Sequence, residues 1–436
     1  MNTRPRAILA SIAALVLAAT AACTSAPPDA SPAPSPGDTG AAVLSGSLRI
    51  ATTNDNADGL NAVLAIYKEE YPEVDVKAEL MTTPDLQSTL RTQLSSGTGP
   101  DVFFTWPGNG NPMSVQNVAP LGFLADLSGQ SWVDKQSDSV KMVTQVDGKQ
   151  WIAPASFAGV GAIYNTTATE AAGLTPPTTW SGVLQFCKDA TAKGKVAYAA
   201  GFQDDWVAQM PAFALTPELV YVDDPEFNTR LYAGSQTFAD SAWRDTYAKY
   251  TEMSDAGCFQ PDPNGTSFAG AVTMLARGDA LAFMQVTAVM AGVIAEAPAG
   301  TELKLLPMPA SEDPTKAALA GAVGVAFGVN AKAENPAAAQ AFIDILMSDE
   351  GQIAYNEAGG SLPPVTVSGF TPPEAVAELT KYQQAGRTSA FPDQLWPNPK
   401  VQSAMMIGVQ DVFAGTKTWD DVLNAMDAAF AEGSGS

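Results

Sequence analysis

The first residues whose types and spacing could do chemistry read NDNADG, at positions 54–59. Acid and amide side chains at alternate positions before a glycine are how a calcium-binding loop of the EF-hand type begins. Such a loop must close with a bidentate carboxylate, but the closing position counted from Asn54 is Ala65. The first ligand would also be an amide rather than a carboxylate. We therefore expect no metal here, and the polar side chains need another explanation.

The chain contains no histidine among its 436 residues. That absence excludes Ser-His-Asp and Cys-His nucleophilic catalysis, imidazole general bases and His-ligated zinc. The formal net charge is −23, which disfavours a nucleic acid or an anionic membrane surface as a partner. The same charge favours a neutral ligand over an anionic one. We expect no cofactor.

The N-terminal segment has the features of a secretory signal. Arg4 and Arg6 form a positive region, and residues 7–22 form an apolar stretch that is short for a membrane span. The small residues directly before Cys23 resemble a bacterial lipobox, in which the cysteine becomes the acylated N-terminus. We expect a signal peptide over residues 1–22 and lipidation at Cys23. The alternative is an ordinary signal with an incidental cysteine.

Residues 23–46 are expected to form a disordered tether. The stretch from Thr24 to Ala42 contains no aromatic residue and is rich in Pro, Ser and Ala, so it cannot build a core. No other stretch of the sequence is apolar over the length that a membrane span requires. These features predict a folded part that is held near a membrane by a lipid.

Two cysteines remain in the part of the chain that is expected to fold, Cys187 and Cys258. In an exported protein an even number of cysteines favours a disulfide. Two buried thiols are the alternative.

Apolar, β-branched runs alternate with segments of helical periodicity from residue 46 onward. Asp58 is placed to cap the first helix, and Pro72 lies just beyond its end. This alternation predicts a parallel sheet with helices packed on it. We expect strands at 46–53, 74–80 and 101–106, and helices at 60–71 and 84–97.

Two polar loops follow strands of this predicted sheet. Residues 54–59 come after the first strand, and residues 106–112 (WPGNGNP) come after the third. Ligands of open α/β sheets bind at the carboxyl ends of the strands, so both loops are candidate binding loops. The alternative is that they are ordinary solvated turns.

Several longer segments occur in an order that resembles a known family. Residues 148–190 contain a Gly-Lys-aromatic turn, a proline-containing strand, Tyr-Asn, and Pro-Pro-Thr-Thr-Trp at the start of a helix. Other matching segments are 95–104 (SSGTGPDVFF), 268–284 (FAGAVTMLARGDALAFM), 322–352 and 359–365 (GGSLPPV). Together they resemble the family 1 extracellular solute-binding proteins, which are the sugar-binding components of ABC importers. The resemblance covers nearly all of residues 47–430.

The resemblance implies an α/β fold of the periplasmic-binding-protein type. Two lobes would be joined by three interlobe crossings, near Ala155, Met308 and Leu362, with the ligand in the cleft between the lobes. Each expected crossing is rich in Pro or Ser and lies between periodic segments. The implied division is lobe 1 over 47–155 and 309–361, and lobe 2 over 156–308 and 362–432.

A sugar site needs planar amides or carboxylates for the hydroxyls and aromatic rings for the C–H faces. The family often has a Gly-x-Trp after the strand that ends at Met284, but here Val286, Thr287 and Ala288 follow, so one stacking ring is missing.

The resemblance places ten candidate residues in the cleft. They are Asn54, Asp55, Trp106 and Asn109 in the first lobe, and Phe157, Gln203, Asp204, Trp206, Gln285 and Trp396 in the second.

Some of these residues have structural alternatives. Trp106, Trp206 and Trp396 lie in loops rich in Gly, Pro or Asp, where binding is favoured, although each ring could be core instead. Asp204 could begin a turn or a helix.

The expected function is that of a lipid-anchored, monomeric solute-binding protein at the extracellular face of a bacterial cell membrane. It would capture a carbohydrate, expected to be an oligosaccharide, by closing its cleft, and would deliver it to the membrane subunits of an ABC importer. It would not be an enzyme. One alternative is a secreted glycoside hydrolase that pairs Asp204 with Asp55. Another is a binding protein for a non-sugar solute, although the candidate loops carry no Lys or Arg for an anionic ligand.

Overall fold

The computed structural model describes residues 44–433. Leu44 packs against a hydrophobic core and strand β1 begins at Gly46, so the tether predicted to reach residue 46 ends earlier than expected. The predicted signal peptide and Cys23 lie outside the described residues. Within residues 44–433 no helix combines the length and the apolar character needed to cross a bilayer.

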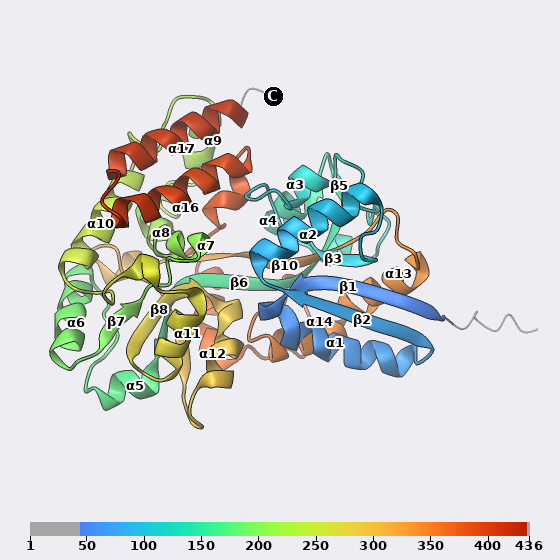
Figure 1. Cartoon of the computed structure of the whole chain (residues 1–436), viewed down its shortest axis with the longest axis horizontal. Helices are drawn as coiled ribbons and strands as arrows, with labels where there is room; N and C mark the ends of the chain where they lie inside the picture. The colour runs from blue at the N-terminus through green and yellow to red at the C-terminus, as the bar shows by residue number, and fades with distance from the viewer. Residues whose placement is uncertain (1–43, 434–436) are drawn as a thin grey trace, which may run out of the picture. The chain divides into compact units, whose positions relative to one another are not determined.

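A mixed sheet runs through the described part of the chain, with the strand order β2-β1-β3-β10-β6-β8-β7 (Figure 1). Strand β1 pairs in parallel with β2 and β3, as the alternation of strands and helices predicted. Strand β10 is antiparallel to β3 and β6, and β11 and β9 pair with β10 and β6. The strands are β1 Gly46–Thr53, β2 Val74–Met81, β3 Val102–Phe104, β6 Ile152–Asn165, β7 Val196–Ala199, β8 Ala280–Val286, β9 Leu303–Leu306, β10 Leu319–Val329 and β11 Thr388–Ser389, besides a separate hairpin of β4 Gln145–Val146 and β5 Lys149–Gln150.

The first helix, α1, has the buried face that its sequence predicted, because Leu60, Val63, Leu64 and Tyr67 are all buried. The predicted cap is wrong. Helix α1 begins at Ala57, so Asp58 lies within its first turn, where a carboxylate is still favourable beside the positive end of the helix.

The other helices pack around the sheet and the two hydrophobic cores (Figure 1). The helices are α1 Ala57–Glu70, α2 Thr83–Ser96, α3 Val115–Val118, α4 Asp138–Thr144, α5 Thr166–Ala171, α6 Trp180–Ala192, α7 Asp205–Ala208, α8 Met210–Thr216, α9 Phe227–Tyr232, α10 Trp243–Asp255, α11 Phe268–Ala276, α12 Met290–Glu296, α13 Pro336–Leu346, α14 Asp349–Ala358, α15 Ala377–Gln384, α16 Pro399–Phe413 and α17 Trp419–Gly433.

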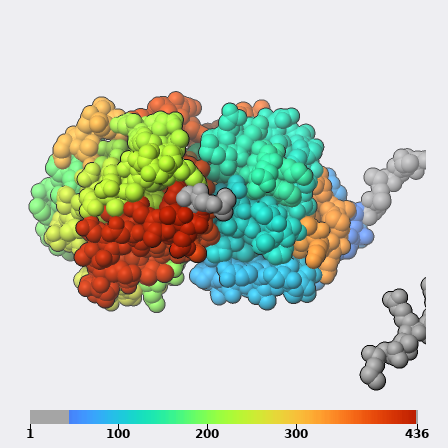
Figure 2. Space-filling view, turned by 90° about the horizontal axis from the view of Figure 1, so that it is seen from above, coloured from blue at the N-terminus to red at the C-terminus, as the bar shows by residue number. Residues whose placement is uncertain are grey.

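Two separate hydrophobic cores share this sheet. The first core is built from β1 to β3, the start of β6, the end of β10, and helices α1, α2, α13 and α14. The second core is built from the rest of β6 and β10, β7 to β9, and the C-terminal helices α16 and α17. Figure 2 shows a seam between the C-terminal helices, in red, and the blue and cyan N-terminal part of the described chain.

The chain passes from one core to the other within strands as well as loops. Ala155 belongs to the first core and Phe157 to the second, at the position of the first predicted crossing. The second core includes Met308, Ala310, Leu319, Ala320 and Ala322, and the first core resumes only at Val323, inside β10. The second passage therefore lies further along the chain than Met308, where the sequence placed it.

Cys187 on α6 and Cys258 after α10 are joined by a disulfide, with their Cα atoms 4.6 Å apart. Both cysteines are fully buried in the second core. The backbone carbonyl of Cys258 also accepts a hydrogen bond from the Tyr198 N–H (3.0 Å), so this disulfide lies beside strand β7.

Candidate ligand-binding cleft

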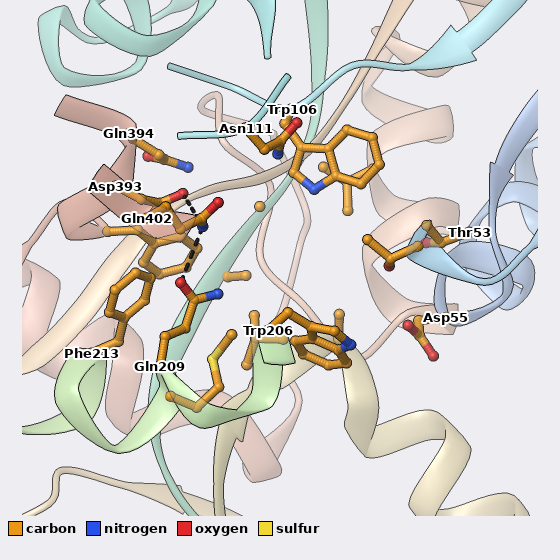
Figure 3. A pocket seen from close by; sticks show the side chains of 18 of the residues that line it. Thr53, Asp55, Trp106, Asn111, Trp206, Gln209, Phe213, Asp393, Gln394 and Gln402 are labelled. Carbon is orange, nitrogen blue, oxygen red and sulfur yellow. Dashed lines mark hydrogen bonds between the residues drawn. The ribbon is translucent and has the colours of Figure 1, made fainter. Parts of the chain in front are cut away.

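A cavity of about 360 Å³ lies between the two cores (Figure 3). Phe104 and Val325 of the first core and Ala158 and Met210 of the second line it. Gly324 of β10 is also in the lining, and a side chain there would meet the Cβ of Ala158 at 2.7 Å. The space is within the size range of small-molecule sites, and small residues of β6 and β10 keep it open.

Two indole rings lie on opposite sides of this cavity, Trp106 and Trp206 (Figure 3). Trp106 comes from the loop after β3, and its ring is 4.0 Å from that of Phe104. Trp206 is on α7, and its ring is 4.9 Å from that of Phe268. Because a second aromatic ring supports each indole, both rings are held in place to contact a flat, apolar ligand face.

Three polar side chains form a hydrogen-bonded chain at one end of the cavity. The side-chain amide of Gln402 donates to Asp393 Oδ2 (3.0 Å) and to Gln209 Oε1 (3.1 Å), as the dashed lines in Figure 3 show. Gln402 lies on α16, Gln209 between α7 and α8, and Asp393 in a 3₁₀ turn over Pro392–Leu395. Residues from three separate segments therefore form this hydrogen-bonded network of Gln209, Gln402 and Asp393, which we call the amide relay.

Burial raises the pKa of Asp393 to about 7, and neighbouring backbone N–H groups offset only part of that rise. Among the described residues no cation forms an ion pair with its carboxylate, and its buried Oδ1 has no hydrogen-bond partner. The carboxyl group is therefore balanced between its neutral and ionised forms near neutral pH.

Asp55 lies at the other end of the cavity, as Figure 3 shows. Desolvation raises the pKa of its carboxyl, even though the residue is exposed to the solvent of the cleft. The neighbouring Asn56 turns inward and donates to the hydroxyls of Thr52 and Thr53, both at 3.0 Å. The NDNADG stretch is thus polar because it forms the turn at the end of β1 and presents one carboxylate to the cleft.

The loop WPGNGNP contacts the 3₁₀ turn that carries Asp393. Gly108 has a positive φ of 70°, and a Cβ on it would lie 2.3 Å from the backbone oxygen of Gln394. A Cβ on Gly110 would lie 2.1 Å from Asp393 Oδ2. Between these glycines, the N–H of Asn109 donates to the backbone oxygen of Gln394 (3.2 Å). The two glycines are required because the first-core loop approaches the Gln394 backbone at Gly108 and the Asp393 side chain at Gly110.

Of the ten residues predicted for the site, the structure brings three together in the lining, namely Asp55, Trp106 and Trp206. Asn54 is exposed and outside the lining, and Asn109 contributes its backbone to the contact with Gln394. The other five also lie outside the lining: Phe157, Gln203, Asp204, Gln285 and Trp396.

Trp396 lies in the second core and outside the lining. It is 1% exposed, and its ring packs 5.8 Å from Phe238 and 6.0 Å from Trp243. Asp204 has the structural role that was its alternative, because its carboxylate accepts the N–H of Phe268 (2.7 Å) at the start of α11.

The remaining three residues are placed by backbone contacts or burial. Phe157 is buried and exchanges backbone hydrogen bonds with Leu362 (2.6 and 3.1 Å). Gln203 is exposed, and its N–H donates to the backbone oxygen of Thr266 (3.1 Å). Gln285 is fully buried, and its Oε1 accepts the N–H of Val286 (2.8 Å).

Sequence reasoning missed most of the polar lining, above all Asn111, Gln209, Asp393 and Gln402. Gln209 follows Trp206 at helical spacing, and Gln402 is a polar residue on the apolar face of α16, so both left a signal in the sequence. Asp393 lies in the same stretch as Trp396, which was the residue predicted from the sequence. Val286 and Ala288, in the segment where a missing stacking ring was predicted, line the cavity together with Val289.

The lining residues, all from the described part of the chain, include three carboxylates, Asp55, Asp205 and Asp393, and no Lys or Arg. Within residues 44–433 there is also no group of three or more His, Cys, Asp or Glu that could hold a metal. The arrangement suits an uncharged ligand that offers hydroxyl groups to amides and carboxylates, and apolar faces to indoles.

A mixed sheet that carries two cores with a cavity between them defines the two-lobed, periplasmic-binding-protein class of α/β fold. Residues 51–353 match the bacterial extracellular solute-binding protein family, and the chain belongs to that family. A curated relative, the multiple sugar-binding protein of Streptococcus mutans, is 21% identical over 314 residues, which is 71% of this chain and 72% of that protein.

Solved structures agree on the fold. The solute-binding protein RafE in complex with raffinose has a TM-score of 0.73 at 20% identity, covering 89% of this chain and 100% of that chain; RafE is also known in its apo form from Streptococcus pneumoniae. The GacH receptor of Streptomyces glaucescens, solved unliganded and with acarbose, has a TM-score of 0.72 at 19% identity, covering 89% and 98%.

Proposed function

We propose that this chain is the lipid-anchored binding protein of an ABC importer for an uncharged carbohydrate of oligosaccharide size. The observation that carries the proposal is the cavity between the two cores, where Trp106 and Trp206 lie on opposite sides of a space edged by amides and carboxylates. The multiple sugar-binding, raffinose-bound and acarbose-bound relatives support a saccharide as the ligand.

The polar groups of the cavity support a hydroxyl-rich ligand. Gln209 and Gln402 are only 4% and 8% exposed, yet each has one amide atom that makes no hydrogen bond within residues 44–433. Both of these atoms are open to the cavity, so a sugar hydroxyl can replace water as their hydrogen-bond partner. A phosphorylated ligand would instead meet three carboxylates and no Lys or Arg in the described lining.

Closure of the cleft would follow from the two-core arrangement. We infer that lobe 1 comprises residues 47–155 and a return segment that starts at Val323 rather than at 309, and that lobe 2 holds most of the rest; core membership supports this division. A ligand that touches both lobes binds the closed state more tightly and shifts the population toward it. The membrane subunits of the importer would then recognise the closed form of a monomer.

The experiment is a thermal-shift screen followed by calorimetry. The probes are raffinose, stachyose, xylotriose and triacetylchitotriose, with glucose 6-phosphate as the anionic comparison. We expect at least one neutral saccharide to raise the melting temperature by mass action, and glucose 6-phosphate to leave it unchanged. We also expect Trp106→Ala to weaken binding. A shift with glucose 6-phosphate alone, or with none of the five, would refute the proposal.

The hydrolase alternative loses its proposed carboxylate pair, because Asp204 lies outside the lining and accepts the Phe268 N–H. We therefore propose a binding protein that is not an enzyme. Incubation with chromogenic glycosides tests this part, and release of the chromophore by the parent but not by an Asp55→Asn variant would contradict it.

The lipid anchor rests on the sequence, since Cys23 lies outside the described residues. In cells that express the full chain, we expect the parent to fractionate with membranes and Cys23→Ala to appear in the medium or the soluble fraction. Membrane fractionation of the variant would show that something other than the lipid holds the protein.

A further inference from the structure

We propose that Asp393 is a positioning residue that fixes which atoms of Gln209 and Gln402 face the ligand, so that the cleft presents one acceptor and one donor to a pair of neighbouring sugar hydroxyls. The inference rests on the proposed function, because it names what that cavity recognises. It starts from the amide relay and not from any similarity to other proteins.

The carboxylate sets the direction of the relay. An ionised Asp393 can only accept hydrogen bonds, so the Gln402 atom 3.0 Å from its Oδ2 must be the amide nitrogen Nε2. The second hydrogen of that nitrogen points at Gln209, 3.1 Å away, which must therefore turn its oxygen Oε1 inward. The N and O ends of both glutamine amides are thus decided by the hydrogen-bond chain.

The other polar atom of each glutamine amide faces the cavity. Gln402 Oε1 and Gln209 Nε2 make no hydrogen bond to any residue from 44 to 433, and Figure 3 shows both directed toward the interior of the pocket. Both side chains are more than nine-tenths buried, but these two atoms remain open to the cavity, so whatever fills the cavity supplies their partners. A hydroxyl that donates to Gln402 Oε1 and a neighbouring hydroxyl that accepts from Gln209 Nε2 would satisfy both atoms.

Residues on the opposite side of the cleft hold Asp393 in position. A Cβ on Gly110 would lie 2.1 Å from its Oδ2, so the glycine loop of the first core packs directly on the carboxylate. The 3₁₀ turn that carries it is held in turn by Gln394, whose side-chain amide donates to the Val323 backbone oxygen (2.8 Å). The direction of the relay in the second lobe thus depends on contacts with β10 and with the loop after β3.

Protonation of Asp393 removes the constraint, since a neutral carboxyl can donate as well as accept. The titratable group that faces it is Tyr221, whose own pKa burial raises. Of the two other carboxylates of the lining, Asp55 lies at the opposite end of the cavity and Asp205 lies on α7. Within the described lining no Lys or Arg is present to keep Asp393 ionised. With its pKa near 7, saccharide affinity should fall as the pH decreases from 8 to 6.

The first measurement needs no ligand. In protein labelled with ¹⁵N-glutamine, the Gln402 side-chain signals, assigned by their loss in Gln402→Leu, should shift with a midpoint near pH 7, following the Asp393 pKa. In Asp393→Asn, which keeps the shape of the side chain, this titration should disappear. Gln402 signals that do not move with pH in the parent would overturn the relay.

The second measurement is calorimetry at pH 6, 7 and 8 with raffinose, stachyose, xylotriose and triacetylchitotriose. For each sugar that binds the parent, we expect Asp393→Asn to bind about 10-fold more weakly at pH 8 and to lose the pH dependence. The matched control is Asp427→Asn. Asp427 is another half-buried carboxylate with a raised pKa, but it accepts the N–H groups of Phe238 and Ala239 and lies outside the lining.

The outcomes are separable. Parent-like affinity and pH dependence in Asp393→Asn would overturn the positioning role while leaving the proposed function intact. Equal losses of saccharide affinity in Asp393→Asn and Asp427→Asn would show that the effect comes from reduced stability, and this result would also overturn the positioning role. If Gln402 titrates but none of the four sugars binds, the proposed function fails and the hydroxyl-pair recognition fails with it.

Discussion

Gly108→Ala should loosen the contact between the two cores, and the structure provides a matched control in Gly122→Ala. Both glycines have almost the same positive φ, 70° and 72°, so both variants meet the same backbone penalty of about 1–2 kcal/mol. A Cβ on Gly122 would meet nothing within 4 Å, whereas a Cβ on Gly108 would lie 2.3 Å from the Gln394 backbone oxygen. The difference between the variants therefore isolates the contact.

Its magnitude follows from the distances. Relieving the overlap requires a separation of about 1 Å, and this kind of overpacking costs about 1–3 kcal/mol. The same movement breaks the hydrogen bond from the Asn109 N–H to the Gln394 oxygen (3.2 Å), which is worth about 1 kcal/mol more. We expect Gly108→Ala to be about 2–4 kcal/mol less favourable than Gly122→Ala at this contact.

Native-state hydrogen exchange of the Asn109 amide measures the contact directly, and urea unfolding measures global stability. The Asn109 amide should exchange about 30-fold to 1,000-fold faster in Gly108→Ala than in Gly122→Ala, since each 1.4 kcal/mol is a factor of ten. Equal exchange rates of the Asn109 amide in the two variants would refute the reasoning, because the added methyl group at residue 108 would then cost no free energy at this contact.

Three further predictions concern single features. Trp206→Ala should weaken saccharide binding, measured by calorimetry, about 5-fold to 150-fold. Trp396→Ala should instead lower the free energy of unfolding in urea by about 3–5 kcal/mol. The opposite pattern would indicate that Trp396 contacts the ligand. Replacing both Cys187 and Cys258 by Ser should remove about 4 kcal/mol of stability, because the bond closes a separation of 71 residues, and an unchanged urea midpoint would contradict this. Burial raises the pKa of Asp393 from its unfolded value of 3.8 to about 7. The contribution of this group to the free energy of unfolding, at most ~4 kcal/mol, is therefore fully present below pH 3.8 and is lost as the pH rises through 7. In urea unfolding between pH 4 and 8, the stability of Asp393→Asn should depend less on pH than that of the parent.

The parts of the fold that local pattern decides could be predicted from the sequence. The alternation of β-branched runs and helical periodicity predicted the parallel pairing of β1 with β2 and β3. The two loops that contain Asp55 and Trp106 were predicted because loops after parallel strands meet at one edge of the sheet, a rule that needs no knowledge of distant contacts, and both residues line the cavity.

The parts that tertiary packing decides could not be predicted in this way. In the stretch FPDQLWPNP, both Asp393 and Trp396 are plausible ligand contacts, and the direction of a short 3₁₀ turn decides between them. That direction is set by the space that Phe238 and Trp243 leave for an indole, and both are distant in the sequence. The second passage between the cores was misplaced for a related reason, because it lies in the middle of a regular strand and not at a turn.

The pairing of β3 with β10 has a consequence for the order in which this chain can fold. Strand β10 is the hydrogen-bonded neighbour of β3, but β4 to β9 come between them in the sequence. The first core therefore has an open strand edge until β10 has been synthesised, and the second core waits for helices α16 and α17 at the end of the described chain. Such long-range closure is slow, and an unpaired edge is a template for pairing with another chain. The interval before β10 arrives is thus when a partly made molecule is most vulnerable to aggregation, and export in an unfolded state would postpone that interval until the whole chain is present.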